Sequence, residues 1–267
     1  MCLNPQVINR SLVVPCGRCI ECLIRRSNEW AWRVSLEAKL YKSNCMVTLT
    51  YSDDYLPQDR SVSRREFQLF LKSIRKAIEP VRIRYFGCGE YGEKYGRPHY
   101  HIILFGYDFP DKYFFKKDKK GIDLYRSPSL EKIWKKGFSS VCEVNYDVAK
   151  YVAVYLQKKM TDGRKGAFVA MSLKPGIGAL TLTSKNVEQD RIYLNGRSRS
   201  LPRYFVKYAE RQGLDVSALK TRRLIKANKY AVDFFERYVS NVAQIHLRKC
   251  EIEKKLGIKL DKYGCIV

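Results

Sequence analysis

Two of the three histidines in this chain stand two residues apart, at His99 and His101. The segment 97–104 is mostly apolar after Pro98 and predicts a strand, on which side chains two residues apart share one face. Both imidazoles are therefore expected to point the same way, as two ligands of one metal ion must. Glu90, near the end of the preceding strand, offers a carboxylate to the same site. Two imidazoles and one carboxylate, completed by water and phosphate oxygens, suit Mn²⁺ or Mg²⁺.

These residue types also have ordinary structural interpretations. Two histidines in an H-x-H pattern on a strand are commonly structural. Glu90 and Glu93 lie in the Gly-rich segment 87–96, where acidic side chains are usually solvated. For Glu93 we favour that interpretation, and we retain Glu90 as the candidate third ligand.

Two tyrosines, Tyr151 and Tyr155, lie four residues apart in a segment that predicts a helix. Residues four apart on a helix are neighbours, about 5–6 Å apart at Cβ. Lysines crowd the same helix, Lys158 among them, and a lysine beside a phenol favours the phenolate and binds phosphate. The pair is therefore a candidate nucleophile for a phosphodiester. The alternative is a half-buried core position, because the chain has 19 tyrosines and apolar residues separate these two.

The net charge of the chain is +24, from 51 Lys and Arg against 27 Asp and Glu. An excess of this size indicates a polyanionic partner. Ribosomal-type RNA binding and membrane-surface binding compete with DNA binding as explanations. Membrane binding is the weaker one, because the sequence has no apolar run of about 18 residues. We also expect no signal peptide, because Asn4, Pro5 and Gln6 interrupt the N-terminal segment.

The nine cysteines, without a signal peptide, predict a reducing cytosol and therefore thiols or metal ligands rather than disulfides. Cys16, Cys19 and Cys22 have the spacing of metal ligands, but a structural Zn²⁺ site usually takes four. The candidates for a fourth ligand are Cys2, Cys45 and Cys142. The alternative is three thiols at one end of a helix.

The order of predicted elements indicates an α+β fold, with helices packed on a mostly antiparallel sheet. We predict helices over about 19–41 and from a capping box at 63–66 to Pro80, and strands over 46–51, 81–86, 97–104 and 140–144. The segments 1–17, 87–96 and 108–121 are predicted to be irregular or turn-forming.

Three segments, Val47–Tyr51, Gly89–His101 and Tyr151–Lys159, together resemble the three motifs of HUH endonucleases, the rolling-circle replication initiators. Two tyrosines four apart are the form seen in replication proteins of small single-stranded DNA phages. With Cys16-Gly17-Arg18-Cys19 and the basic C-terminal region, the whole chain resembles the replication initiators of gokushoviruses (Microviridae). The motifs cover residues 46–160 and are specific only jointly.

The resemblance implies a sheet akin to the RNA-recognition module, with His99 and His101 as metal ligands and Glu90 as the third. It implies Tyr151 and Tyr155 as nucleophiles, with Lys158 beside them. One tyrosine would form a 5′-phosphotyrosine on origin DNA and leave a 3′-OH primer; the second would cut the regenerated origin and allow circles to close. The chain has no G-x-x-x-x-G-K-[ST] motif, so a host helicase and polymerase in the bacterial cytoplasm are the expected partners.

The composition changes after about residue 165, which predicts a division into a nuclease domain over 1–165 and a basic C-terminal DNA-binding region over 166–267. From Arg197 onward there are 17 Lys and Arg against 7 Asp and Glu, a net charge of +10, in a region predicted to be mostly helical. The alternative to a nuclease is a non-catalytic nucleic-acid-binding or DNA-packaging phage protein, for which basic and aromatic residues suffice without a metal.

Overall fold

The computed structural model describes residues 2–92, 95–119, 121–150, 152 and 167–266. Within it the chain forms two compact units. The sheet unit is Trp30–Thr181, and the terminal unit combines Met1–Glu29 with Leu182–Val267. This division differs from the boundary expected at residue 165. Residues 168–171 pair with the sheet, and the first 29 residues cluster with the C-terminal region.

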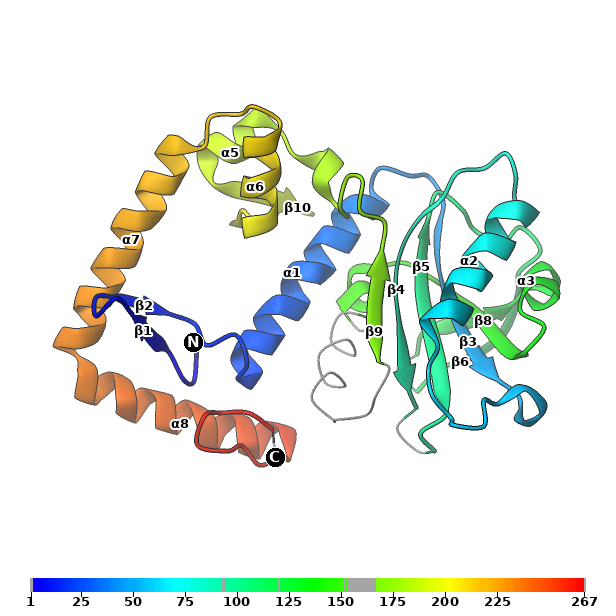
Figure 1. The fold of residues 1–267 in the computed structure, drawn as a ribbon, viewed down its shortest axis with the longest axis horizontal. Helices are drawn as coiled ribbons and strands as arrows, with labels where there is room; N and C mark the ends of the chain where they lie inside the picture. The colour runs from blue at the N-terminus through cyan, green and yellow to red at the C-terminus, as the bar shows by residue number, and fades with distance from the viewer. Residues whose placement is uncertain (1, 93–94, 120, 151, 153–166, 267) are drawn as a thin grey trace. The chain divides into compact units, whose positions relative to one another are not determined.

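The sheet unit is built on a seven-stranded sheet in which every neighbouring pair is antiparallel, in the order β6-β7-β8-β3-β5-β4-β9 (Figure 1). The strands are β3 (Asn44–Tyr51), β4 (Arg84–Tyr91), β5 (Pro98–Phe105), β6 (Tyr113–Lys117), β7 (Asp123–Arg126), β8 (Gly137–Glu143) and β9 (Phe168–Met171). The predicted α+β fold with an antiparallel sheet is confirmed.

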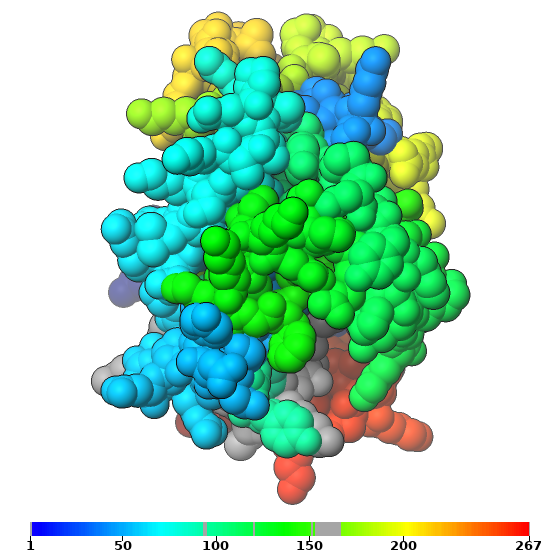
Figure 2. Space-filling view, turned by 90° about the vertical axis from the view of Figure 1, so that its right-hand side faces the viewer, coloured from blue at the N-terminus to red at the C-terminus, as the bar shows by residue number. Residues whose placement is uncertain are grey.

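Alternation along the strands gives the sheet two apolar faces. One face, with Leu49 and Ile102, packs under helix α2 (Arg64–Ala77) through Phe67. Helix α3 (Pro128–Ile133) lies beside α2, and Figure 2 shows the two, in cyan and green, on the outer surface of this unit. The two helices therefore shield one sheet face and leave the other for different partners.

The opposite face, which carries Met46 and Ile103, packs against the end of α1 (Ile20–Ala38) and against Val148, Ala149 and Val152. Residues 146–150 are helical, and the Asn145 side chain accepts a hydrogen bond from the Val148 backbone N–H at 2.8 Å. The predicted helix that carries the tyrosine pair therefore begins with an N-cap and packs its first turn on this face.

Several local predictions were wrong, each for a physical reason. Strand β4 begins at Arg84 and continues through Gly87 and Gly89 to Tyr91, where a turn was expected. A Cβ on Gly87 would lie 2.6 Å from the His101 carbonyl oxygen, and one on Gly89 would lie 2.6 Å from the Phe168 ring. These glycines serve close packing between strands rather than a turn.

Two segments predicted to be irregular contain strands. Residues 113–117 form the edge strand β6, because aromatic side chains favour extended backbone. Residues 6–14 contain a hairpin of β1 (Gln6–Ile8) and β2 (Leu12–Val14). The predicted capping box is half formed. Ser63 caps the Glu66 N–H, but its own N–H donates to the Tyr100 hydroxyl, and the Glu66 carboxylate pairs with Lys136.

The terminal unit is mostly helical, as predicted for the C-terminal region. Its elements are β1, β2, α5 (Ser184–Gln189), β10 (Arg191–Leu194), β11 (Arg197–Ser200), α6 (Arg203–Arg211), α7 (Ser217–Glu236) and α8 (Tyr238–Leu256). Val13 of β2 packs against Ala231 and Phe234 of α7 (Figure 1). Among the described residues, no helix combines the length and the apolar character needed to cross a membrane.

Candidate active site

Strand pairing brings the three predicted metal ligands to one face of the sheet. His99 of β5 stands directly opposite Glu90 of β4, so their side chains share a face, and His101 follows two residues on. This is the face that carries Met46 and Ile103, not the face under α2. The helical residues 146–150 pack on the same side through Val148.

Glu90 and His101 form a buried pair, with 3.0 Å between the Glu90 Oε1 and His101 Nε2 atoms. Their exposed fractions are 4% and 7%. Two adjacent ligands of an octahedral Mg²⁺ at about 2.1 Å lie roughly 3.0 Å apart, so this pair fits a shared divalent cation. Among the described residues, however, the ligand atoms that all lie within 4.8 Å of one another belong to four cysteines elsewhere. His99 would therefore have to bring its Nε2 atom closer to complete the triad.

Both imidazoles are held from behind by threonines of β3. The Thr48 hydroxyl lies 3.1 Å from His101 Nδ1, and the Thr50 hydroxyl lies 2.8 Å from His99 Nδ1. A histidine that binds metal through Nε2 carries its proton on Nδ1 and donates it to such a group, which fixes the ring. The sequence analysis assigned no role to these threonines. Their signal is the alternation within Val47–Tyr51, which places Thr48 and Thr50 on one face.

A glycine makes room for the His99 ring. A Cβ on Gly92 would lie 2.6 Å from His99 Nε2. The Gly92 N–H donates to the Arg97 carbonyl at 2.8 Å and closes the hairpin between β4 and β5. We had assigned this glycine only to a turn, but the backbone also needs it because the imidazole passes so close.

A cavity of about 210 Å³ opens beside His101. Thr48, Asp118 and Val148 lie in its wall, so it connects the histidine face with the start of the helix at residue 146. The predicted nucleophiles Tyr151 and Tyr155, and Lys158, lie outside the described residues, as does Glu93.

Two other tyrosines near the histidines are poor nucleophiles. Tyr51 and Tyr100 lie on the α2 face with their hydroxyls 3.1 Å apart. Burial raises the pKa of both phenols, so that each disfavours the phenolate. Attack by a phenolate therefore has to come from the opposite face, where the cavity lies.

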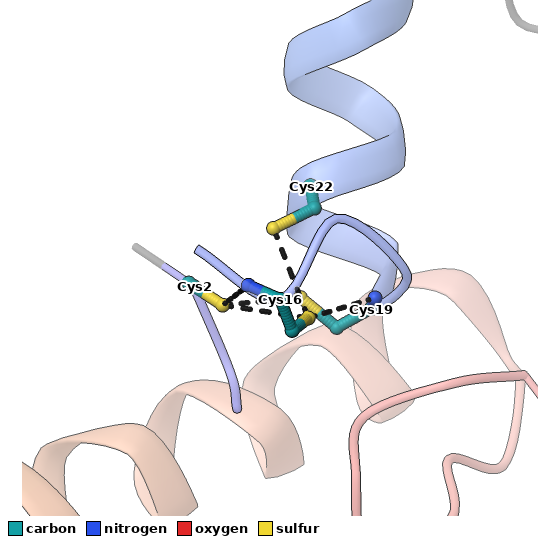
Figure 3. A group of neighbouring side chains, drawn as sticks. All are labelled: Cys2, Cys16, Cys19 and Cys22. Carbon is teal, nitrogen blue, oxygen red and sulfur yellow. Dashed lines mark hydrogen bonds between the residues drawn. The ribbon is translucent and has the colours of Figure 1, made fainter. Parts of the chain in front are cut away.

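The predicted metal ligands of the cysteine cluster lie in the terminal unit. Cys16, Cys19 and Cys22 are joined by Cys2 (Figure 3). The other two candidates for a fourth ligand, Cys45 and Cys142, are buried in the two cores of the sheet unit. The structure thus selects Cys2 from the three alternatives.

The fold and the site define an α+β protein with a histidine–carboxylate cluster on an antiparallel sheet. The sequence model of the replication-associated protein ORF2 family matches residues 44–160, which contain this cluster and the tyrosine pair. Replication-associated protein ORF2 of Spiroplasma virus 4 is 34% identical over 232 residues, 78% of this chain and 71% of that protein. The chain belongs to the replication-associated protein ORF2 family.

Two further phage proteins are similar to the chain. Replication-associated protein ORF4 of Chlamydia phage 1 is 32% identical over 221 residues, 75% of this chain and 54% of that protein. Replication-associated protein VP4 of Bdellovibrio phage phiMH2K is 32% identical over 160 residues, 57% of this chain and 50% of that protein. The matches confirm the resemblance to a phage rolling-circle replication initiator. No solved structure matches the chain.

Proposed function

We propose that this replication protein nicks viral DNA at the origin by metal-dependent transesterification and rejoins the ends to release circles. The observation that carries the proposal is the buried Glu90–His101 pair, 3.0 Å apart, at the wall of a cavity that also reaches the helix beginning at residue 146. Such a face places acid, imidazole and the nucleophile-bearing helix around one space.

His99, His101 and Glu90 would hold Mg²⁺ or Mn²⁺, with Thr48 and Thr50 fixing the two imidazoles. When bound, the cation supplies stabilisation of the negative charge that develops on the phosphate during in-line displacement. The buried walls around Glu90 exclude bulk water from that side and strengthen the electrostatic interaction.

Tyr151 and Tyr155 would be the nucleophiles. If the predicted helix continues from residue 146 at about 100° per residue, both positions fall on the side of Val148, which lines the cavity. The phenolate oxygen of one tyrosine forms a bond to phosphorus as the bond from phosphorus to the 3′-oxygen breaks. The phenol loses a proton and the 3′-oxygen gains one. Lys158 would favour the phenolate.

The product of this step keeps the energy of the cut bond in a 5′-phosphotyrosine, so rejoining needs no ATP. The second tyrosine cuts the regenerated origin after synthesis, and the freed 3′-OH attacks the first phosphotyrosine to close a circle. Single-stranded and origin DNA would be the substrates, and a host helicase and DNA polymerase the partners, in the cytoplasm of the bacterial host.

The proposal is tested by incubating the full chain with single-stranded viral origin DNA and Mn²⁺. A covalent protein–DNA adduct that survives denaturant is the expected product, and omission of metal with excess chelator is its control. If no adduct and no nicked DNA form at any Mn²⁺ or Mg²⁺ concentration, the nuclease assignment is wrong.

A non-catalytic nucleic-acid-binding protein is the second candidate, and one observation favours it. The edge strand β6 exposes Tyr113, Phe114 and Phe115 beside Lys116 and Lys117. Exposed aromatic rings interleaved with lysines form a stacking surface for single-stranded bases. Binding of DNA without any covalent adduct would select this candidate over the nuclease.

Replacing Thr48 by valine is expected to raise the Mn²⁺ concentration for half-maximal cleavage by about tenfold, since partners of metal ligands typically contribute 10–100-fold. Thr48→Ser, which keeps the hydroxyl, should restore the wild-type requirement. Thr221→Val, at an exposed position of α7, is the matched control. The measurement is cleavage rate against metal concentration; an unchanged requirement in Thr48→Val would remove the threonine from the site.

DNA binding is expected to be strongly salt-dependent, with much of it in the basic region after Arg197. Removing that region whole is a poor test, because α7 supports β2. Lys226→Gln with Lys229→Gln, both exposed on α7, should instead lower the salt slope by up to about 1.4, or about 0.7 for each single-strand phosphate contact.

The matched control for this pair is Lys72→Gln with Lys76→Gln, both exposed on α2. Helix α2 covers the sheet face opposite the histidines, so these two changes should leave the slope unaltered. Equal losses in both variants, measured as log Kd against log salt, would show that only overall charge matters.

A further inference from the structure

Four thiols meet in the terminal unit, far apart in sequence but not in space. The Cys2 Sγ atom lies 3.5 Å from Cys16 Sγ and 3.8 Å from Cys19 Sγ, and Cys16 Sγ lies 4.0 Å from Cys22 Sγ (Figure 3). All four sulfur atoms lie within 4.8 Å of one another. Four sulfurs about 2.3 Å from a tetrahedral Zn²⁺ lie roughly 3.8 Å apart, which is the observed spacing.

The backbone is arranged to stabilise charged sulfur. The N–H groups of Arg18 and Cys19 point at Cys16 Sγ, at 3.4 and 3.3 Å. The Cys16 N–H points at Cys2 Sγ at 3.3 Å, and the Leu3 N–H points at Cys19 Sγ at 3.4 Å. Donors aimed at three of the four sulfurs favour thiolates, the form that binds metal. Gly17, with φ of 77°, allows the tight turn between Cys16 and Cys19.

We infer that Cys2, Cys16, Cys19 and Cys22 bind a structural Zn²⁺ ion that fastens the N-terminal segment to the start of α1. Four thiolates close the coordination sphere and leave no open position for substrate, so this site is structural rather than catalytic. It is a separate site from the histidine face, which lies in the other unit.

The cluster also organises the C-terminal segment. The thiols Cys2, Cys19 and Cys22 are buried in one apolar cluster with Ile252 of α8 and with Leu260. The Ile20 N–H donates to the Gly264 carbonyl at 3.0 Å. A Cβ on Gly264 would lie 2.7 Å from Leu3 Cβ, so the segment passes directly over the residue after Cys2. Zinc ligation therefore holds together the two ends of the chain in this unit.

Two other fates of these thiols are open to test. A disulfide needs sulfur atoms about 2.05 Å apart, and one pair would leave the other two sulfurs without a partner. A four-thiolate site also accepts iron. Zinc is favoured because it has no redox chemistry and its preferred geometry is tetrahedral, as the four sulfurs are arranged.

The full chain, purified under reducing conditions, is expected to contain one zinc ion per molecule by elemental analysis. Co²⁺ exchanged into the site should give the intense absorption bands of tetrahedral cobalt thiolate. Alkylation followed by peptide mapping should find these four cysteines protected with zinc and reactive after strong chelation, while the exposed Cys250 reacts in both states. No DNA is needed, so this result is independent of nicking activity.

Cys2→Ser and Cys16→Ser should lose zinc, Cys250→Ser should keep it, and Cys22→His should retain it because imidazole replaces thiolate as a ligand. Where a serine variant fails to fold, the wild-type zinc content and the alkylation map still decide the matter. A wild-type chain free of metal after reconstitution with Zn²⁺ would overturn the inference. So would iron in place of zinc, a disulfide among the four, or full zinc in Cys2→Ser.

Discussion

Replacing His101 by alanine is expected to lower the rate of DNA cleavage by at least about 100-fold and to leave DNA binding nearly unchanged. The imidazole lies 3.0 Å from the Glu90 carboxylate and is held by Thr48, so its loss removes a ligand and leaves a buried acid with no imidazole beside it. Loss of a residue that merely orients a ligand already costs about 10–100-fold. Binding should persist because lysine and arginine contacts to phosphates supply most of it.

The third histidine of the chain provides the matched control. His246 is exposed on α8, in the terminal unit, and His246→Ala should cleave at the wild-type rate. Single-turnover cleavage at saturating Mn²⁺ and the Kd for single-stranded DNA are the two measurements. A His99→Ala/His101→Ala double variant that nicks at full rate with metal present would remove the histidine face from the reaction.

The histidine face was predictable because it rests on a local rule. Alternation along one strand puts His99 and His101 on the same side, whatever the rest of the fold does. Glu90 was predicted for the right place but the wrong local structure. Gly87 and Gly89 suggested a turn, whereas tight contacts with neighbouring strands require them in β4. Such contacts depend on strand order, which a single sequence does not reveal.

Non-local pairing also explains what the sequence analysis missed. Thr48 supports His101 only because β3 lies between β8 and β5, a strand order that is not sequential in the chain. The spacing of Cys16, Cys19 and Cys22 predicted a metal site, but three cysteines were equal candidates for a fourth ligand. The choice of Cys2 follows from the path of the N-terminal segment past Cys16, which no spacing rule contains.

The nuclease assignment depends most on the two tyrosines, and conservative changes there should have the clearest outcome. Tyr151→Phe and Tyr155→Phe are each expected to leave a protein that cuts once, or cuts poorly, and completes no circles. The double variant should form no covalent adduct. Each step of the proposed cycle uses one phenol oxygen, and phenylalanine removes that oxygen while keeping the ring.

Tyr146→Phe is the matched control, because Tyr146 lies in the same predicted helix and is half buried on the histidine face. If the tyrosine pair only filled the core, all three substitutions would have similarly small effects, since loss of a hydroxyl costs little unless it was hydrogen-bonded. Adduct yield, circle yield and mapping of the phosphotyrosine by peptide mass separate the two cases. A phosphotyrosine found on neither Tyr151 nor Tyr155 would rule out the pair as nucleophiles, even with nicking established, because the bond to DNA must then form on another residue.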